Sequence, residues 1–249
     1  VAVARTAPKH DGLKEIREAA RLTVDALWAA RRTIYIEAQY LTSSLVGAVL
    51  ARKLRAADGP EVVIVVTRDS NGFIERWAMG TNRDRLLRKL RRADRHDRMR
   101  VVYPCFDGDP PQQILVHAKL IVVDDRFIRV GSSNLNNRSI ALDTECDLAI
   151  EATARRDRDR IVEIRNALLA EHLDAEPARV AEIVAREGSL RAVVDGLNGS
   201  KRCLRAFEDV SDKGPTRPVF GTFFLDPKRP RPFLRFLTPR PKPKKSLLS

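Results

Sequence analysis

The chain has 249 residues, 43% of them hydrophobic, which suffices for one α/β domain with a sizeable core. Its formal net charge of +13 favours anionic partners such as phospholipid head groups or nucleic acid. The three cysteines form no CxxC pair and no histidine stands at metal-ligand spacing, which argues against a zinc site and a disulfide framework. No apolar run approaches the roughly 18 residues of a membrane span.

The chain begins at Val1, without the charged and apolar regions of a signal peptide, and this start predicts a piece of a longer protein. We expect the protein in the cytoplasm or at a membrane surface, and secreted only where a signal precedes Val1.

Apolar periodicity over the first 70 residues predicts alternating strands and helices. Strands are expected at 1–5 and 33–39, with a helix over about 13–27 between them. A helix over 45–54 and a β-branched strand at 61–67 follow, separated by the helix-breaking pair Gly59-Pro60. A continuous β-branched run is typical of a buried parallel strand.

The middle of the chain continues the same alternation, with a polar loop at 69–80 and a helix at 82–95. Strands are predicted at 99–103, 115–123, 126–130 and 145–150, with Asp124-Asp125 as the turn between the second and third of these. The predicted fold class is therefore α/β, with a mixed, largely parallel β-sheet flanked by helices.

The C-terminal third changes character twice. Helical spacing extends over 154–173 and then in shorter helices to about residue 207, whereas prolines and basic residues dominate from Lys213 onward. We predict a catalytic half-domain at 1–173, a helical extension at 174–212 and an irregular basic tail at 213–249. The tail is expected to bind an anionic membrane surface or to remain without regular structure.

One strand presents chemically active side chains on a single face. His117 and Lys119 are two residues apart, so a strand places both on one side, with Ala118 and Leu120 on the other. Ser132 and Asn134 share the same spacing after Gly131. Such a cluster offers a nucleophile or proton carrier, a cation and neutral donors, which suits attack on a phosphodiester without a metal or another cofactor.

The segment HAKLIVVDDRFIRVGSSNLNNRS resembles the phospholipase D superfamily signature, HxKx4D followed by GSxN. The signature residues are His117, Lys119 and Asp124, and Glu145 in DTECDLAIE resembles the acidic position downstream. The flanking RRTIYIEAQYLTS and RVVYPCFDGD are similar to the second half of bacterial two-motif phospholipases D. The resemblance covers about residues 1–172 and departs at Ala38, where many relatives carry an asparagine.

The resemblance implies a role for each of these residues. His117 is expected to act as general acid and then general base, and Glu145 to orient its imidazole. Lys119 and Asn134 are expected to bind phosphate oxygens, Ser132 to support them, and Asp124 to be structural, although it belongs to the catalytic motif.

In that family two such motifs meet to form one active site, whereas this chain holds one. We therefore expect a phospholipase D or transphosphatidylase half-site, acting on phospholipid through a phosphohistidine, whose second motif comes from a missing N-terminal half or from a homodimer. Two alternatives stay open: a homodimeric nuclease acting on nucleic acid, and an inactive lipid-binding half-domain.

Other features carry less specific predictions. Phe73 and Trp77 are expected either to line an acyl or head-group cleft or to cap the core. The arginines of residues 83–100 are expected either to face solvent or to rest on an anionic surface. His10, His96 and His172 fit no catalytic pattern and are predicted to lie at the surface or at helix ends.

Overall fold

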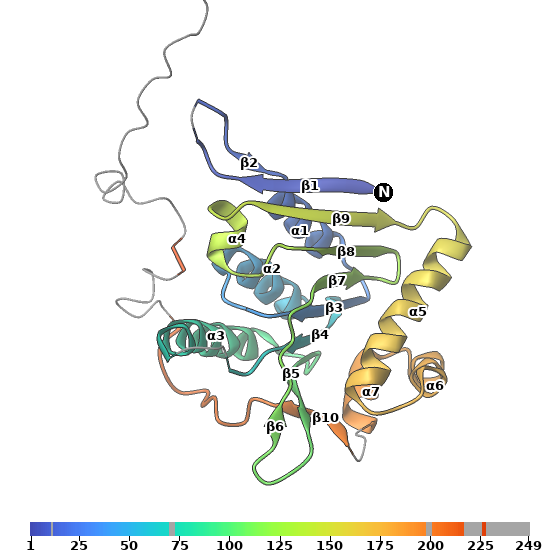
Figure 1. Cartoon of the computed structure of the whole chain (residues 1–249). Helices are drawn as coiled ribbons and strands as arrows, with labels where there is room; N and C mark the ends of the chain where they lie inside the picture. Colours follow the sequence, from blue (N-terminus) through green and yellow to red (C-terminus); the bar gives the residue numbers. More distant parts are fainter. Residues whose placement is uncertain (11, 70–72, 198–200, 217–225, 228–249) are drawn as a thin grey trace, which may run out of the picture.

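The fold is described here from a computed structural model, for residues 1–10, 12–69, 73–197, 201–216 and 226–227, without the side chains of 73–78. A single mixed β-sheet forms its centre, in the strand order β10-β5-β4-β3-β7-β8-β9-β1-β2, with β6 paired to β5 (Figure 1). The strands are β1 (Ala2–Ala7), β2 (Ile16–Arg17), β3 (Thr33–Ala38), β4 (Glu61–Val66), β5 (Met99–Phe106), β6 (Gln112–Gln113), β7 (Lys119–Val123), β8 (Phe127–Gly131), β9 (Glu145–Glu151) and β10 (Arg202–Ala206).

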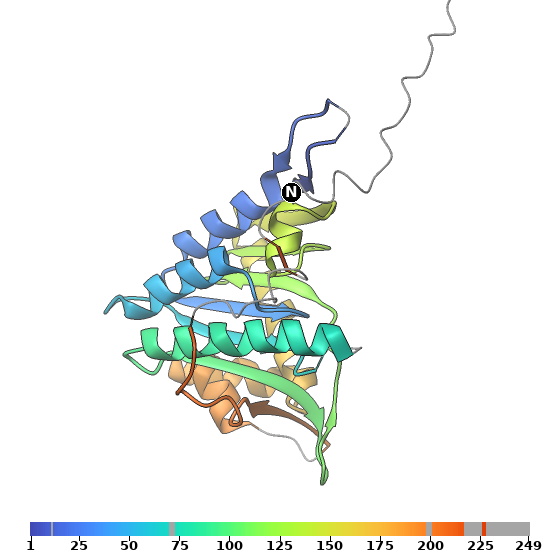
Figure 2. The same ribbon diagram turned by 90° about the vertical axis from the view of Figure 1, so that its left-hand side faces the viewer.

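Helices cover the sheet on two sides. Figure 2 shows α1, α2 and α3 stacked along one face, while α5, α6 and α7 lie against the other. The helices are α1 (Glu18–Ala29), α2 (Ser44–Arg55), α3 (Phe73–Ala93), α4 (Asn137–Ala141), α5 (Arg155–His172), α6 (Pro177–Glu187) and α7 (Leu190–Gly196). The predicted α/β class, with a mixed sheet flanked by helices, is confirmed.

Two hydrophobic clusters fill the spaces between these layers. Buried residues of α1, α2 and α3 pack against alternate positions of the sheet, among them Ile36 and Ile121. Buried residues of α5, α6 and α7 pack against the intervening positions, such as Val63 and Val122. The alternation arises because successive strand residues point to opposite faces. Strand β4 is buried on both faces, as its unbroken β-branched sequence predicts.

Several details differ from the sequence prediction. Within the described residues only the β3–β4 and β4–β5 pairs are parallel, so the sheet is less parallel than expected. Helix α3 already begins at Phe73, inside the predicted loop at 69–80. The side chains of Phe73 and Trp77 lie outside the described residues, and their predicted role stays untested. Residues 202–206, expected to be helical, form a strand that pairs with β5.

The β10–β5 pairing also brings two of the cysteines together. Cys203 lies directly opposite Cys105 in the register, and both are buried, with their Sγ atoms 2.9 Å apart as a thiol pair. Burial, followed by the contact with Cys203, raises the pKa of the Cys105 thiol to about 12. Cys146 is exposed. Cys203 therefore packs in a strand rather than in the predicted helix.

The ends of four strands meet at one edge of the sheet and position the residues predicted to carry chemistry. Strand β7 runs antiparallel to both β3 and β8, and β8 runs antiparallel to β9. The C-terminal ends of β3 and β8 therefore lie beside the N-terminal ends of β7 and β9. His117, Lys119, Ser132, Asn134 and Glu145 all lie at or next to these ends.

Candidate active site

His117 lies two residues before the start of strand β7, and its side chain is exposed. Among the described residues the imidazole makes no hydrogen bond or ion pair. It is therefore open to a substrate or to a partner.

Lys119 is the first residue of β7 and is 9% exposed. Its Nζ donates to the carbonyl oxygen of His117 at 2.7 Å and to Oε1 of Gln39 at 3.2 Å. Burial lowers the pKa of the Lys119 ammonium, and the negative charge of Glu145 opposes this effect. The strand pairing that puts Ala38 opposite Lys119 also brings Gln39 to the ammonium. Position 38, where many relatives carry an asparagine, is alanine in this chain. The neighbouring Gln39 supplies an amide that contacts Lys119.

Asp124 lies at the opposite end of β7 from Lys119. Asp124 and Asp125 both have positive φ, 53° and 57°, as the central residues of a type I′ turn require, and the N–H of Arg126 donates to the carbonyl oxygen of Val123 at 3.0 Å. The Asp124 carboxylate accepts from the backbone N–H groups of Arg31, Arg32 and Thr33 at 2.8, 2.7 and 2.9 Å. It thereby fixes the start of β3 to the β7–β8 turn.

Ser132 and Glu145 form a hydrogen-bonded pair between the end of β8 and the start of β9. The Ser132 hydroxyl donates to Oε2 of Glu145 and accepts from the backbone N–H of Cys146 at 3.0 Å. The predicted hydrogen bond between Glu145 and the His117 imidazole does not occur among the described residues. Glu145 instead orients the hydroxyl of Ser132.

The loop that carries Ser132 and Asn134 is held from inside by a buried ion pair. Nε of Arg129 donates to the Asp147 carboxylate at 2.7 Å, and both side chains are at most 1% exposed. Arg129 also donates to the carbonyl oxygen of Ser133 at 2.7 Å, and the Ser133 N–H donates to Asp147 at 3.1 Å. A Cβ at Gly131 would overlap the Asp147 carboxylate, so this close approach requires glycine.

Asn134 follows Ser133, whose backbone is held by the Arg129–Asp147 ion pair. Its Oδ1 is buried and, among the described residues, has no hydrogen-bond partner. Because buried polar atoms are nearly always paired, this oxygen is available to accept from an additional donor, whereas the side-chain NH2 of Asn134 is the group that can donate to a phosphate oxygen. Together the five side chains present a histidine, a cation, a carboxylate and two neutral polar groups at one edge of the sheet.

The comparison with known families identifies this arrangement. Residues 23–171, more than half of the chain, match the family model described as cardiolipin synthase, PLD-like domain. The chain belongs to the phospholipase D superfamily.

This phospholipase D-like chain is 31% identical over 157 residues to Phospholipase D A of Dictyostelium discoideum, covering 51% of this chain and 12% of that protein. It aligns with phosphatidylserine synthase of Haemophilus influenzae Rd KW20 at a TM-score of 0.50 and 20% identity, over 77% of this chain and 46% of the other. Nuc of Salmonella typhimurium, a phospholipase D family member, aligns at a TM-score of 0.46 and 18% identity, over 66% of this chain and 91% of Nuc.

Some residues of this phospholipase D-like site escaped the sequence analysis. No role was predicted for Arg129 and Asp147, the buried ion pair. An arginine inside an apolar strand is nevertheless a signal for a buried partner. Gln39 lies in the segment RRTIYIEAQYLTS, but no role was predicted for it. Asp226 is 3% exposed and bonds segments next to the site; it is the one acidic residue in the sequence of 213–249, a signal to which the sequence analysis gave no role.

A second missed cluster lies on the other face of the sheet. The Tyr35 hydroxyl donates to Oε1 of Glu37 at 2.5 Å, and Nε2 of His172 lies 3.1 Å from the same oxygen. Burial, followed by the charge of Glu37, raises the pKa of Tyr35 well above its ordinary value. His172 ends α5, as a helix-end residue was predicted to do, but its side chain is largely buried against Glu37. This cluster joins α5 to β3.

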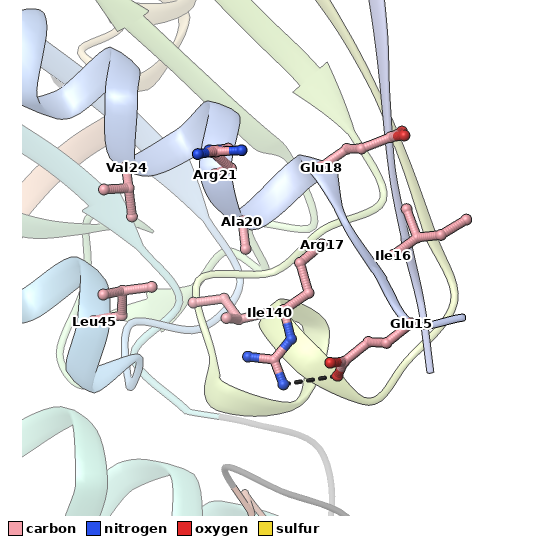
Figure 3. Close-up of a pocket in the computed structure, with 9 residues that line it drawn as sticks. All are labelled: Glu15, Ile16, Arg17, Glu18, Ala20, Arg21, Val24, Leu45 and Ile140. Atoms are coloured by element: carbon pink, nitrogen blue, oxygen red, sulfur yellow. Dashed lines mark hydrogen bonds and ion pairs between the residues drawn. The ribbon is translucent and has the colours of Figure 1, made fainter. Parts of the chain in front are cut away.

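A pocket of about 570 Å³ lies elsewhere, between the start of α1, α2 and α4 (Figure 3). Ala20, Val24, Leu45 and Ile140 give it apolar walls, and Arg17 pairs with Glu15 at its rim at 2.7 Å. It contains none of the predicted site residues. Within the described part of the chain, no cluster of His, Cys, Asp or Glu could ligate a metal ion, and no helix is long and apolar enough to cross a membrane.

Proposed function

We propose that this chain supplies one half of a phospholipase D-type active site that cleaves a phospholipid to phosphatidic acid and an alcohol. The observation that carries the proposal is the exposed His117, whose imidazole has no partner among the described residues, next to the buried Lys119, at the sheet edge that also holds Asn134. The family description and the similarity to Phospholipase D A support a phospholipid as the substrate.

Lys119 and Asn134 are the residues that would bind the phosphate. The ammonium is partly desolvated and held by two oxygen acceptors, so it is oriented before a substrate binds. A positive charge in such a site stabilises the charge that builds up on non-bridging oxygens in the transition state. Ser132, fixed by Glu145, would support the same oxygens. In this proposal Glu145 acts through Ser132.

The reaction needs two histidines. One imidazole nitrogen attacks phosphorus, so that an N–P bond forms and the P–O bond to the head group breaks, while the second imidazole donates a proton to the leaving oxygen. The second imidazole then takes a proton from water as the water oxygen attacks phosphorus, which breaks the N–P bond and releases phosphatidic acid. We assign His117 to the second role.

The other histidine must come from a second motif, in a preceding half or in a second copy of this chain. A half-site without its partner lacks the nucleophile, and loss of acid–base catalysis alone costs about 10²- to 10⁴-fold in rate. Binding of the phosphate would survive, since Lys119 and Asn134 are both within this chain.

The test compares hydrolysis of phosphatidylcholine and of single-stranded DNA by this chain alone and by the chain joined to a half that carries the other motif. We expect phosphatidic acid release only with both motifs present, and loss of at least 10²-fold activity in His117→Ala. His96→Ala is the matched control, because that histidine lies outside the cluster, and its activity should be unchanged.

Two outcomes contradict the proposal. Hydrolysis of DNA alone, by a dimer of this chain, would establish the nuclease. Phospholipid binding without turnover in the two-motif protein would establish an inactive lipid-binding domain.

A further inference from the structure

The carboxylate of Asp226 lies in a buried polar site made by the loop after β3 and the start of α4, which follows the Asn134 loop. It accepts from the Thr42 hydroxyl at 2.7 Å, from the backbone N–H and side-chain amide of Asn137 at 2.8 Å each, and from the backbone N–H of Arg138 at 3.1 Å. Asp226 is 3% exposed and lies outside residues 23–171, the part that matches the family model. Residues 226–227 are the isolated red segment in Figure 1.

One of these two segments carries Asn134, and the other carries Gln39, the partner of the Lys119 ammonium. Thr42 follows β3 and is three residues after Gln39, which accepts from the Lys119 ammonium. Asn137 follows β8 and is three residues after Asn134. The loops already touch through Leu135, whose carbonyl oxygen accepts from the N–H groups of Thr42 and Ser43 at 2.9 and 2.8 Å.

We propose that Asp226 is a positioning residue of the active half-site, which holds the Gln39 loop and the Asn134 loop at the spacing that a phosphate needs. The inference rests on the proposed function, because it takes Lys119 and Asn134 as the phosphate ligands. It also assigns part of the site to a segment beyond the family domain.

The energetics favour a specific role for the charge. Hydrogen bonds to a carboxylate are about twice as strong as neutral ones, and four of them converge on Asp226. Asparagine at this position would replace one oxygen by an amide nitrogen, which cannot accept from an N–H group. At least one of the buried donors would then lose its partner. The loops would remain near each other, because the bonds to Leu135 persist, but their spacing would change.

Among the described residues that precede Asp226 in the chain, those of 207–216 are hydrogen-bonded to α3. Arg91 of α3 donates to the carbonyl oxygen of Phe207 at 2.6 Å, and Arg88 donates to that of Ser211 at 2.8 Å. Arg85 donates to the carbonyl oxygen of Thr216 at 3.3 Å. Burial lowers the pKa of Arg85, and the negative charge of Asp226 opposes this effect.

The experiment measures the dissociation constant of inorganic phosphate for the full chain, by titration of the amide signals of Asn134, together with the midpoint of thermal unfolding. We expect Asp226→Asn to weaken phosphate binding by about tenfold, the equivalent of one charge-assisted hydrogen bond. Thr42→Val, which removes one of the four donors, should weaken binding in the same direction by less. Asp212→Asn is the matched control, since Asp212 is an exposed aspartate of the same C-terminal segment, and it should leave binding unchanged.

Lys119→Ala separates the two hypotheses. If this substitution leaves phosphate binding unchanged, the proposed phosphate site is wrong, and the role of Asp226 falls with it. If Lys119→Ala abolishes binding while Asp226→Asn and Thr42→Val lower only the unfolding midpoint, the proposed function stands and Asp226 is merely structural.

Discussion

At the scale of the residue, the motif spacing predicted which side chains gather, but not how they are bonded. Alternation along β7 places Lys119 on the face of Ile121, as expected, with Leu120 in the opposite cluster. The predicted partner of Glu145 was the imidazole of His117, whereas the structure pairs this carboxylate with the hydroxyl of Ser132, because strand register and loop geometry bring Ser132 next to it. Such contacts depend on ångström-scale strand ends, which a sequence pattern does not specify.

The lowered pKa of Lys119 can be measured directly. We expect the Lys119 ammonium to titrate below the ordinary lysine value, and Glu145→Gln to lower this pKa further, because the charge that opposes the effect of burial is then removed. Side-chain NMR of the lysine Cε and Nζ atoms as a function of pH is the measurement. Glu151→Gln, at the exposed far end of β9, is the control and should leave the pKa of Lys119 unchanged.

The same shift sets the sign of a stability effect. Since the Lys119 pKa is lower in the folded chain than in the unfolded chain, the unfolded chain binds more protons between the two values. The free energy of unfolding contributed by this residue therefore rises with pH across that window. A Lys119 pKa at or above its ordinary value would contradict both statements.

At the scale of the element, the apolar strands and the long helices followed from periodicity, whereas short and edge elements did not. Two-residue strands such as β6 and the five-residue α4 are too short for a periodic signal. Strand β10, which was expected to be helical, has the sequence Arg-Cys-Leu-Arg-Ala without a strict polar–apolar alternation, and pairing with β5 decides its conformation.

Helix α3 shows a use of arginine that composition cannot distinguish from a solvated face. Its arginines bind the chain's own backbone: Arg91 donates to the carbonyl oxygens of Phe207 and Val210, and Arg92 to those of Asp212 and Gly214. Carbonyl oxygens of the segment after β10 are thereby paired. Those side chains therefore contribute to the fold and not only to an anionic contact surface.

Arg91→Ala should accordingly destabilise the chain by about 1–3 kcal/mol, because two backbone acceptors lose a charged donor. Arg95→Ala, at an exposed position two residues after α3 ends, should change the free energy of unfolding by less than about 0.5 kcal/mol. Urea denaturation of both variants checks the difference. Equal effects would mean that the contacts of Arg91 are dispensable.

At the scale of the whole molecule, the charge divides into two populations. The arginines of the folded part are largely engaged in ion pairs and backbone contacts, among them Arg129 with Asp147 and Arg100 with Asp195. Residues 228–249, which lie outside the described structure, hold eight Lys or Arg and no acidic residue, against a net charge of +13 for the chain. Residues 228–249, the end of the predicted basic tail, therefore provide most of the long-range attraction for an anionic partner.

This charge distribution predicts that the basic residues of 228–249 dominate binding to an anionic membrane. Replacing the eight Lys and Arg of residues 228–249 by Gln should weaken binding to phosphatidylglycerol vesicles by up to about 1 kcal/mol per removed charge, and most at low salt, where screening is least. Replacing the exposed Arg155, Arg156 and Arg158 of α5 by Gln is the control, and should change vesicle binding far less per charge. Cosedimentation at two salt concentrations, with single-stranded DNA as competitor, provides the measurement. If the tail variant binds vesicles as tightly as the unaltered chain, contact with the membrane comes from the folded surface, and the tail serves another purpose.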